Sequence, residues 1–443
     1  MKLKPKILVY SKIYLFKNLN FLKNILGTSL FKVLSLNSLS IVLKIILGFA
    51  SSKLIAIFIG PSGLAIIGNF KNFLTSTEAI GTLGFENGII KYTAENRNDE
   101  EKLKQTLSTV FFSVLTAIII LSCFIFFFSN YLNFNIFGFH YPYQIYFKVL
   151  ALVLPIYIGN LILLTILNGL QQFKKVILIN VIGNCLTLIL AFVFIQKFGL
   201  QGAIFNLVIA PAVLFFVSVY FLNQQLNLTS FIKLSYFNIS VLKKLSSFTL
   251  MTLFAALAGS LVLLTIRKNI ISTLGIEQAG FYEAMNRNSN YYFIFISSII
   301  SLYFLPKMAI AKDKFETKSL IFDYYKKIIP IFILGLLLIY FFRNQFILIL
   351  LSKEFLPCSK LFFWQLLGDF FKALSLILGY QFFAKKLTKQ FLIFETISLI
   401  LLYFSTHYFM HLFKIEGVVI GYAFTYLFYF IFLIIFFRRS LFF

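Results

Sequence analysis

The sequence predicts an all-α membrane protein of about twelve transmembrane helices in two halves of six. Of its 443 residues, 60% are hydrophobic and only 12% are charged, and the mean hydropathy is +0.91. Apolar runs of roughly 20 residues, the length that crosses about 30 Å of hydrocarbon, recur along the whole chain. No polar segment is long enough for a soluble domain, so a separate catalytic domain is not expected.

Apolar runs between polar breaks place the individual helices. The first half is expected near residues 31–58, 62–90, 106–129, 144–168, 176–196 and 201–222. The second half is expected near 247–271, 276–307, 328–342, 357–384, 390–410 and 417–437. The predicted units are therefore a first lobe at 29–222 and a second lobe at 247–443. An amphipathic linker at 223–246 is expected to join them at the membrane surface.

Basic residues are concentrated in alternate connections. One side of the membrane holds most of them, in 91–105, Lys174 and Lys175, 223–246, 307–327 and 385–389. The 130–143 connection on the other side has no Lys or Arg. Because Lys and Arg are enriched in cytoplasmic loops, both termini are predicted to be cytoplasmic. Residues 1–28 carry six lysines and predict an amphipathic segment on the anionic inner leaflet, not a cleaved signal peptide.

The net charge of +25 does not indicate a nucleic-acid partner. A nucleic-acid interface gathers basic residues on one soluble face, whereas here they lie mostly in short loops. The three cysteines lie beside or within apolar stretches, and the three histidines show no ligand spacing. Neither a disulfide framework nor a metal or cofactor site is therefore predicted.

A weak repeat relates the two halves. The segment GPSGLAIIGNFK at 60–71 has a counterpart about 217 residues later, at 275–288, where Gly280 precedes Phe281 and Tyr282. In both places a long helix is followed by a tight glycine-containing turn and a second helix that bears Asn and a cation. Halves repeated in the same membrane orientation indicate a site between them.

Polar residues inside the spans are the candidate site residues, because an ionisable group at hydrocarbon depth needs a cavity or a partner. On the eighth helix, four polar residues form one stripe at i, i+3, i+4 and i+7: Glu283, Asn286, Arg287 and Asn290. We interpret this stripe as the lining of a cavity. The alternative is an internal ion pair between Glu283 and Arg287 that only joins helices.

A similar stripe lies on the tenth helix, where Gln365, Asp369 and Lys372 follow Trp364. Asp369 and Lys372 can neutralise each other, so a structural ion pair and contact with a polar substrate both remain open. An aspartate that changes partner during transport is also a candidate protonation site. Asp369 and, on the second helix, Glu78 are therefore the candidates for ion coupling.

The first two helices supply further cations. Lys71 and Glu78, seven residues apart, share a face of the second helix, which also carries Asn69. On the first helix Lys44 is too deep to snorkel easily, whereas Lys53 lies near the outer end. The expected cavity holds Lys44, Lys71, Arg287 and Lys372, with Lys53 near its mouth, against Glu78, Glu283 and Asp369. This small excess of positive charge suits a pyrophosphate attached to sugars, because Lys and Arg can replace the hydration that the phosphates lose.

Four segments resemble Wzx-type flippases, above all the branch that moves O-antigen and enterobacterial common antigen units. They are LKIILGFASSKLIAIFIGPSGLAIIGNFKNF (43–73), FENGIIKYTAE (85–95), SSFTLM (246–251) and FFWQLLGDFFKALSLILGY (362–380). The most specific piece is WQLLGDFFK at 364–372, and the resemblance covers about residues 30–440.

The resemblance implies a MATE-like fold, in which two six-helix lobes surround a cleft that opens alternately to either side. It implies an undecaprenyl-pyrophosphate-linked oligosaccharide as substrate, moved to the periplasmic leaflet of the bacterial inner membrane without bond chemistry. Membrane lipids, an O-antigen polymerase and a chain-length regulator are implied partners. The positions carried over are Lys44, Lys53, Asn69, Lys71, Asn87, Lys91, Arg267, Gln365, Asp369 and Lys372.

Two features depart from the family pattern: the basic residues 1–28 and the eighth-helix stripe that begins at Glu283. We interpret the stripe as the part that selects particular sugars. A lipid II flippase and a drug or metabolite antiporter of the same fold remain alternatives, although a cationic cleft argues against the antiporter. A membrane glycosyltransferase or polymerase is not favoured, because it would need paired carboxylates or a large periplasmic loop and no connection in this sequence is long enough.

Overall fold

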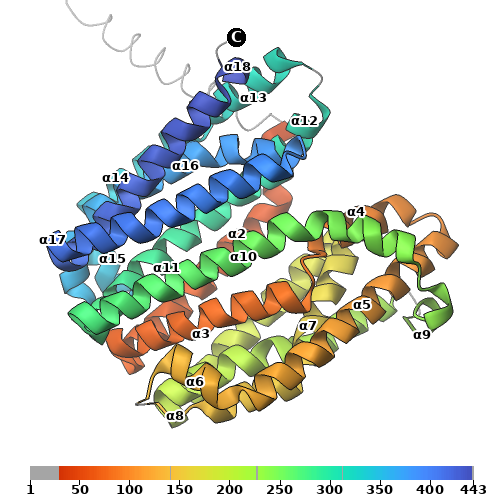
Figure 1. The fold of residues 1–443 in the computed structure, drawn as a ribbon, viewed down its shortest axis with the longest axis horizontal. Coiled ribbons are helices and arrows are strands. Elements are labelled where there is room, and N and C mark those ends of the chain that lie inside the picture. The colour runs from red at the N-terminus through yellow and green to blue at the C-terminus, as the bar shows by residue number, and fades with distance from the viewer. Residues whose placement is uncertain (1–28, 140, 226–227, 312, 442–443) are drawn as a thin grey trace, which may run out of the picture.

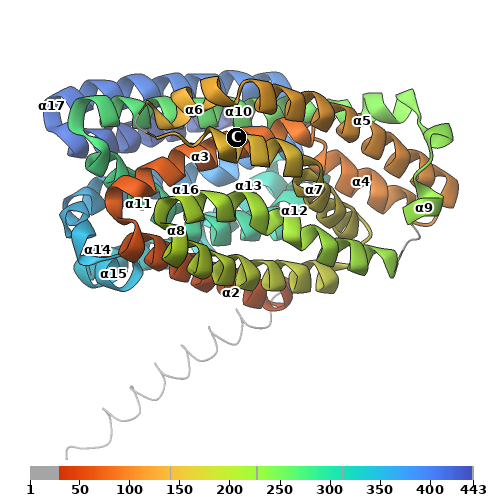
Figure 2. The same cartoon turned by 90° about the horizontal axis from the view of Figure 1, so that it is seen from below.

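The computed structural model describes residues 29–139, 141–225, 228–311 and 313–441, and the basic segment 1–28 lies outside them. Every regular element in the described residues is a helix. Figure 2 shows that the long helices run roughly along one axis, as expected of a bundle that crosses a bilayer. The prediction of an all-α protein is confirmed.

The described helices account for twelve passes. Eight are long and apolar enough to cross a membrane. Two of the eight make two passes each, because α8 (Phe173–Asn223) is broken at Gly199 and α17 (Thr388–Phe436) at Phe413 and Lys414. Helices α2 (Ser29–Phe58) and α3 (Gly60–Gly81), with 30 and 22 residues, add two more. The predicted number of about twelve is confirmed.

The other elements follow the predicted order. The first half also contains α4 (Glu86–Asn96), α5 (Glu100–Phe127), α6 (Ser129–Phe137) and α7 (Gln144–Gly169). The second half contains α10 (Ile239–Leu274), α11 (Ile276–Ile299), the π turn η2 (Ile300–Phe304), α12 (Leu305–Ile310), α13 (Lys314–Lys327), α14 (Ile329–Phe341), α15 (Arg343–Leu350), the 3-10 segment η3 (Lys353–Leu361), α16 (Phe362–Ala384) and α18 (Arg438–Leu441).

The connection between the halves differs from the predicted amphipathic helix at 223–246. Its described residues hold the short helix α9 (Leu228–Phe231) and the 3-10 turn η1 (Leu234–Tyr236), and α10 begins before the predicted boundary. The connection is bound to α5: Ser108 Oγ donates to the Phe231 carbonyl at 2.9 Å, and Thr109 Oγ1 accepts from the Asn238 backbone at 3.0 Å. These hydroxyls bind backbone groups that a continuous helix would have paired internally.

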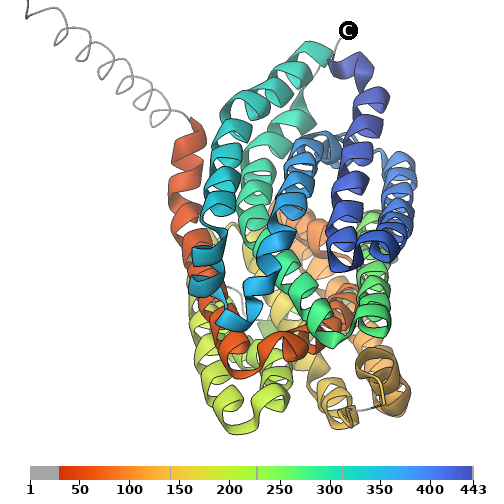
Figure 3. The ribbon, with the colours of Figure 1, turned by 90° about the vertical axis from the view of Figure 1, so that its left-hand side faces the viewer.

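The two halves meet along α3 of the first half and α10 and α11 of the second. Figure 1 shows α16 and α17 on one side of these helices and α5 to α8 on the other, and Figure 3 shows the second half above the first. The elements that the sequence repeat relates, α3 and α11, are therefore in contact with each other.

The halves are packed most tightly where α3 and α11 begin, which we call the closed end. Each helix starts at a glycine with positive φ, +71° for Gly60 and +96° for Gly275, a conformation that other residues rarely adopt. A Cβ on Gly280 would lie only 2.0 Å from the Pro61 carbonyl oxygen. The two helix backbones can approach this closely because Gly280 has no side chain.

Burial changes abruptly along both central helices. In α3 every residue from Gly63 to Phe70 is buried, and Lys71 is exposed. In α11 the residues from Ala279 to Ser289 are buried except for half-buried Asn286, and Asn290 is exposed. Helices α3 and α11 of the two halves contact each other, and in each of them the buried stretch ends at an exposed residue. We call the exposed region that begins at Lys71 and Asn290 the central cleft, and these two residues its floor.

Candidate functional site

Three polar side chains, Asn69, Arg267 and Glu283, form what we call the interface triad. Arg267 of α10 is 1% exposed, and its Nη2 pairs with the carboxylate of Glu283 on α11. Its Nη1 donates to Asn69 Oδ1 of α3 at 2.9 Å, and Asn69 Nδ2 donates to the Ile136 carbonyl of α6 at 3.1 Å. Gly68 leaves room for the ion pair, since a Cβ there would lie 2.6 Å from the Glu283 carboxyl carbon. The triad joins both halves.

The ion pair considered between Glu283 and Arg287 is not formed. Glu283 pairs with Arg267 instead, although Arg287 is the i+4 neighbour on the same helix. A buried guanidinium needs a counter-charge, and Arg267, 1% exposed, is more deeply buried than Arg287, 9% exposed. Arg267 therefore takes the carboxylate, because it is the cation with less access to water.

Arg287 is left without a counter-ion among the described residues. None of the ion pairs that the structure describes includes it. Its Nε and Nη1 atoms are buried and have no hydrogen-bond partner. Buried polar groups in folded proteins are nearly always paired, and a guanidinium can offer five donors to one anion. Arg287 therefore has the properties of a residue that can bind an anion.

Two lysines bring further positive charge to Arg287. Lys71 lies within electrostatic range of Arg287, Glu283, Glu78 and Lys44. Lys44 and Lys71 are both exposed, and neither belongs to an ion pair between described residues. We call Lys44, Lys71 and Arg287 the cationic site. It combines α2 and α3 of the first half with α11 of the second.

Neutral and acidic groups border the cationic site. Glu78, one of the two carboxylates in range of Lys71, accepts a hydrogen bond from the Tyr157 hydroxyl of α7. Asn72, which follows Lys71 in sequence, has a buried amide nitrogen without a hydrogen-bond partner among the described residues, and Asn286, which precedes Arg287, lies beside the Tyr282 hydroxyl. The Asn72 amide is a donor available to a neutral polar ligand such as a sugar.

A separate polar group surrounds Asp369 of α16, which is fully buried. Its Oδ2 accepts from Ser289 Oγ at 2.7 Å and from the Tyr292 hydroxyl, and its Oδ1 accepts from the Tyr422 hydroxyl at 2.8 Å. Gln365, one turn earlier, donates to Ser289 Oγ at 2.9 Å, and its buried Oε1 has no partner. We call these three hydroxyl residues and Asp369 the hydroxyl cage.

The ion pair considered between Asp369 and Lys372 is also absent. Lys372 Nζ lies 4.7 Å from the ring centroid of Phe293, 5.1 Å from that of Tyr426 and 5.9 Å from that of Tyr422. Cation–π contacts of this kind contribute about 0.5–2 kcal/mol each. Three hydroxyl donors satisfy the carboxylate, so the ammonium group is free to occupy the aromatic surface.

Lys53 lies at the closed end, away from Lys44. Its Nζ donates to the Leu348 carbonyl near the end of α15 at 2.5 Å, so it connects the first half to the second. Nearby, the Tyr291 hydroxyl donates to the Gly48 carbonyl at 2.7 Å and is hydrogen-bonded to Ser52. In this arrangement Lys53 contributes to the contact between the halves.

Sequence reasoning located the two stripes and missed most of their partners. The residues that it missed are the hydroxyls around the carboxylates and the rings around Lys372: Tyr157, Ser289, Tyr292, Tyr422, Phe293 and Tyr426. One signal was present, since a carboxylate predicted to be deeply buried requires several donors. Which of the many tyrosines supply them depends on helix contacts that periodicity does not show.

Comparisons with known sequences identify the family of the chain. A sequence model of the family described as "Polysaccharide biosynthesis protein" matches residues 29–312. Two relatives described as "Lipid III flippase", from Escherichia coli strain K12 and Shigella flexneri, are each 26% identical over 395 residues. Each alignment covers 88% of this chain and 93% of the relative.

Solved structures with the same fold are MATE transporters. A structure described as the inward-facing conformation of a multidrug resistance MATE family transporter has a TM-score of 0.72 at 16% identity, covering 89% of this chain and 95% of that one. The outward-facing conformation has a TM-score of 0.65 at 16% identity, covering 91% and 95%. The chain therefore belongs to the polysaccharide biosynthesis protein family and has a MATE-like fold, as the sequence resemblance indicated.

Proposed function

We propose that the protein is a flippase for an undecaprenyl-pyrophosphate-linked oligosaccharide of the O-antigen repeat-unit type. The observation that carries the proposal is Arg287, a buried guanidinium without a counter-ion beside the central cleft. Lys71 and Lys44 add two exposed cations in the same region. The relatives described as lipid III flippases support a lipid-linked saccharide, and the MATE-like fold supports transport by alternating access.

The cationic site suits the pyrophosphate group. Charge-assisted hydrogen bonds from Arg and Lys replace the hydration that phosphates lose on entering the protein. The amides of Asn72 and Asn290 supply neutral donors and acceptors for sugar hydroxyls. The polyprenyl tail stays in lipid between the halves, because moving it into water would cost about 0.8 kcal/mol per CH₂ group. The head group alone needs to enter the cleft, and no bond is made or broken.

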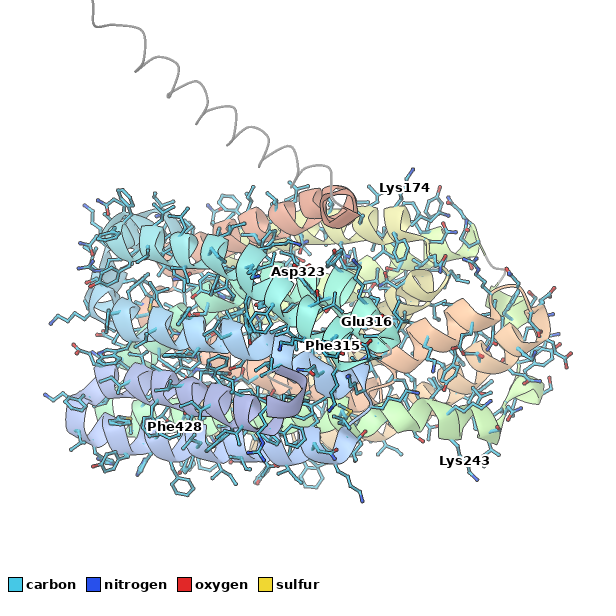
Figure 4. All side chains as sticks on the ribbon, turned by 90° about the horizontal axis from the view of Figure 1, so that it is seen from above. Lys174, Lys243, Phe315, Glu316, Asp323 and Phe428 are labelled. Carbon is cyan, nitrogen blue, oxygen red and sulfur yellow. The ribbon has the colours of Figure 1, made fainter. Side chains whose placement is uncertain are left out.

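We propose that the central cleft faces the cytoplasm in this structure. The tight contact between Pro61 and Gly280 blocks the closed end, and the cleft floor at Lys71 and Asn290 opens away from it. Exposed lysines such as Lys174 and Lys243, which project from the surface in Figure 4, lie near the beginnings of α8 and α10, at the other end. The positive-inside rule then places that end in the cytoplasm of a bacterial inner membrane. This arrangement would take its substrate from the cytoplasmic leaflet.

The charge of the site also separates this proposal from a drug antiporter of the same fold. Many drugs are cations, and an uncompensated Arg287 flanked by Lys71 would repel them. A lipid II flippase has the same phosphate chemistry and differs in the attached sugars. Lipid II is therefore included in the test as a second substrate. Transport of lipid II alone would contradict the proposal that the substrate carries an O-antigen-type glycan.

The test is flipping in proteoliposomes. The purified protein is reconstituted with an undecaprenyl-pyrophosphate oligosaccharide, and the sugar is modified by a reagent that cannot cross the membrane. We expect the protein to make sugars of both leaflets reactive, whereas empty vesicles expose one leaflet only. Lys44→Glu and Lys71→Glu should abolish this effect, and Lys389→Glu, at an exposed position in the first turn of α17, should not. Full activity of both cleft variants would contradict the cationic site.

We further propose that Asp369 couples transport to a monovalent cation or a proton, with Glu78 as the second candidate. The hydroxyl cage joins α11, α16 and α17, so a change of charge on Asp369 alters contacts among three helices. The unpaired Oε1 of Gln365 is an additional oxygen ligand close to the carboxylate. Oxygen-only groups of this kind suit protons or hard monovalent cations.

Asp369→Asn is expected to remove the stimulation of flipping by an imposed ion gradient, because the amide stays neutral throughout. Flipping without a gradient should persist. The measurement compares initial rates with and without a sodium or proton gradient. Asp323→Asn, which changes a half-buried aspartate paired with Lys327 on α13, is the matched control. Gradient stimulation that survives in Asp369→Asn would remove the assignment.

A further inference from the structure

We propose that Arg267 is a positioning residue: by occupying the carboxylate of Glu283, it keeps Arg287 available to the phosphate groups of the substrate. The proposal rests on the proposed function, because it concerns access to the same guanidinium. It assigns the interface triad a role in binding, in addition to its role in joining the halves.

The first step is the arrangement within α11. Glu283 precedes Arg287 by four residues, so both side chains lie on one face of the helix. A glutamate four residues before a cation is the favoured order for an ion pair on a helix surface. Glu283 and Arg287 are thus natural partners, and their separation in this structure requires a competitor.

The second step is that the competitor is Arg267. Its guanidinium uses one nitrogen for Glu283 and another for Asn69, which is itself held by the Ile136 carbonyl. Arg267 is 1% exposed, so leaving it unpaired would place an uncompensated charge in a dry contact between helices. Gly68 lets the pair lie directly against α3. These contacts hold the carboxylate of Glu283 on the Arg267 side.

The third step is the effect on charge. The Arg267–Glu283 pair has no net charge. The charged groups that remain are the cations Arg287, Lys71 and Lys44 and one carboxylate near Lys71, that of Glu78. If Glu283 turned to Arg287, an internal carboxylate would occupy the guanidinium that the phosphates need. Arg267 therefore raises the anion affinity of a site that it does not itself contact.

The experiment measures binding of inorganic pyrophosphate to the purified protein by titration calorimetry, together with flipping. Arg267→Met should weaken pyrophosphate binding by about tenfold or more, because the freed Glu283 becomes a competitor for Arg287. Adding Glu283→Gln should restore binding to near the wild-type level. The unfolding midpoint of each variant excludes a purely structural role of Arg267: in that case pyrophosphate binding would fall and recover with the midpoint, whereas the proposal predicts weakened binding by Arg267→Met protein that is still folded. Arg343→Met, near the closed end, is the matched control and should bind normally.

The outcomes separate this inference from the proposed function. If the double variant binds no better than Arg267→Met while Arg287→Met alone abolishes binding, the inference is wrong and the proposed function stands. If Arg287→Met binds and flips like the wild type, the proposed function itself fails. Should Arg267→Met not fold, Arg267→Gln and Arg267→Gln/Glu283→Gln give the same comparison, because glutamine can still donate to Asn69 but removes the charge that holds Glu283. Rescue by Glu283→Gln in that background supports the inference, and its absence overturns it.

Discussion

Replacing Arg287 by methionine is expected to reduce flipping of a pyrophosphate-linked oligosaccharide to the rate of empty vesicles. Each charge-assisted hydrogen bond contributes about 1.5–3 kcal/mol, so losing a two-pronged contact with phosphate weakens binding by about 100-fold or more. The change should not destabilise the protein. Methionine has a similar length and removes a buried charge that has no counter-ion among the described residues, so thermal stability in detergent should stay the same or rise.

The measurement pairs the flipping rate with the thermal unfolding midpoint of the same preparation. Arg287→Lys keeps the positive charge but loses the planar guanidinium group that can donate two parallel hydrogen bonds, so it should retain intermediate activity. Loss of function together with unchanged or higher stability is typical of a residue kept for binding at a cost in stability. Wild-type flipping by Arg287→Met, or a large fall in its unfolding midpoint, would show that the residue has a structural partner instead.

Most of the fold could be predicted because the bilayer restricts the chain so strongly. The apolar run at 144–168 became α7 (Gln144–Gly169), and the polar breaks near Gly199 and Lys414 became the non-helical points inside α8 and α17. Helices α6, α13 and α15 were not foreseen. Helices α6 and α15 are too short to span a membrane, and α13 is the polar first part of the span that α14 completes, so an apolar run does not locate them.

The candidate site was predicted in its positions but not in its pairings. Helical periodicity showed that Glu283 and Arg287 share a face, and so do Asp369 and Lys372. The only partners that it offered were within each helix, as an alternative to a cavity lining, whereas in the folded chain Glu283 binds Arg267 and Asp369 binds three hydroxyls. Partner choice depends on which helices touch and how dry each contact is. A single sequence shows neither property, and the unpaired state of Arg287 follows from both.

Gly280→Ala is expected to open the closed end and to slow flipping several-fold. A Cβ at this position would lie 2.0 Å from the Pro61 carbonyl oxygen and 2.4 Å from its carbonyl carbon, and a backbone group cannot rotate away as a side chain can. Overpacking of this kind costs about 1–3 kcal/mol, which changes the balance between two arrangements of the halves by about fivefold to 150-fold. The arrangement with α3 and α11 in contact should therefore lose population.

The shift can be measured with Thr75→Cys on α3, an exposed position beyond the cleft floor, after Cys123, Cys185 and Cys358 are replaced. A membrane-impermeant thiol reagent added on the side of the closed end should label it slowly in the parent protein and much faster with Gly280→Ala. Gly259→Ala and Gly335→Ala are matched controls, because a Cβ there meets no atom within 4 Å. Equal labelling in all four proteins would mean that the contact between Pro61 and Gly280 does not seal the cleft. Faster labelling confined to Gly280→Ala would show that the absence of a side chain at one residue lets the repeated helices close together.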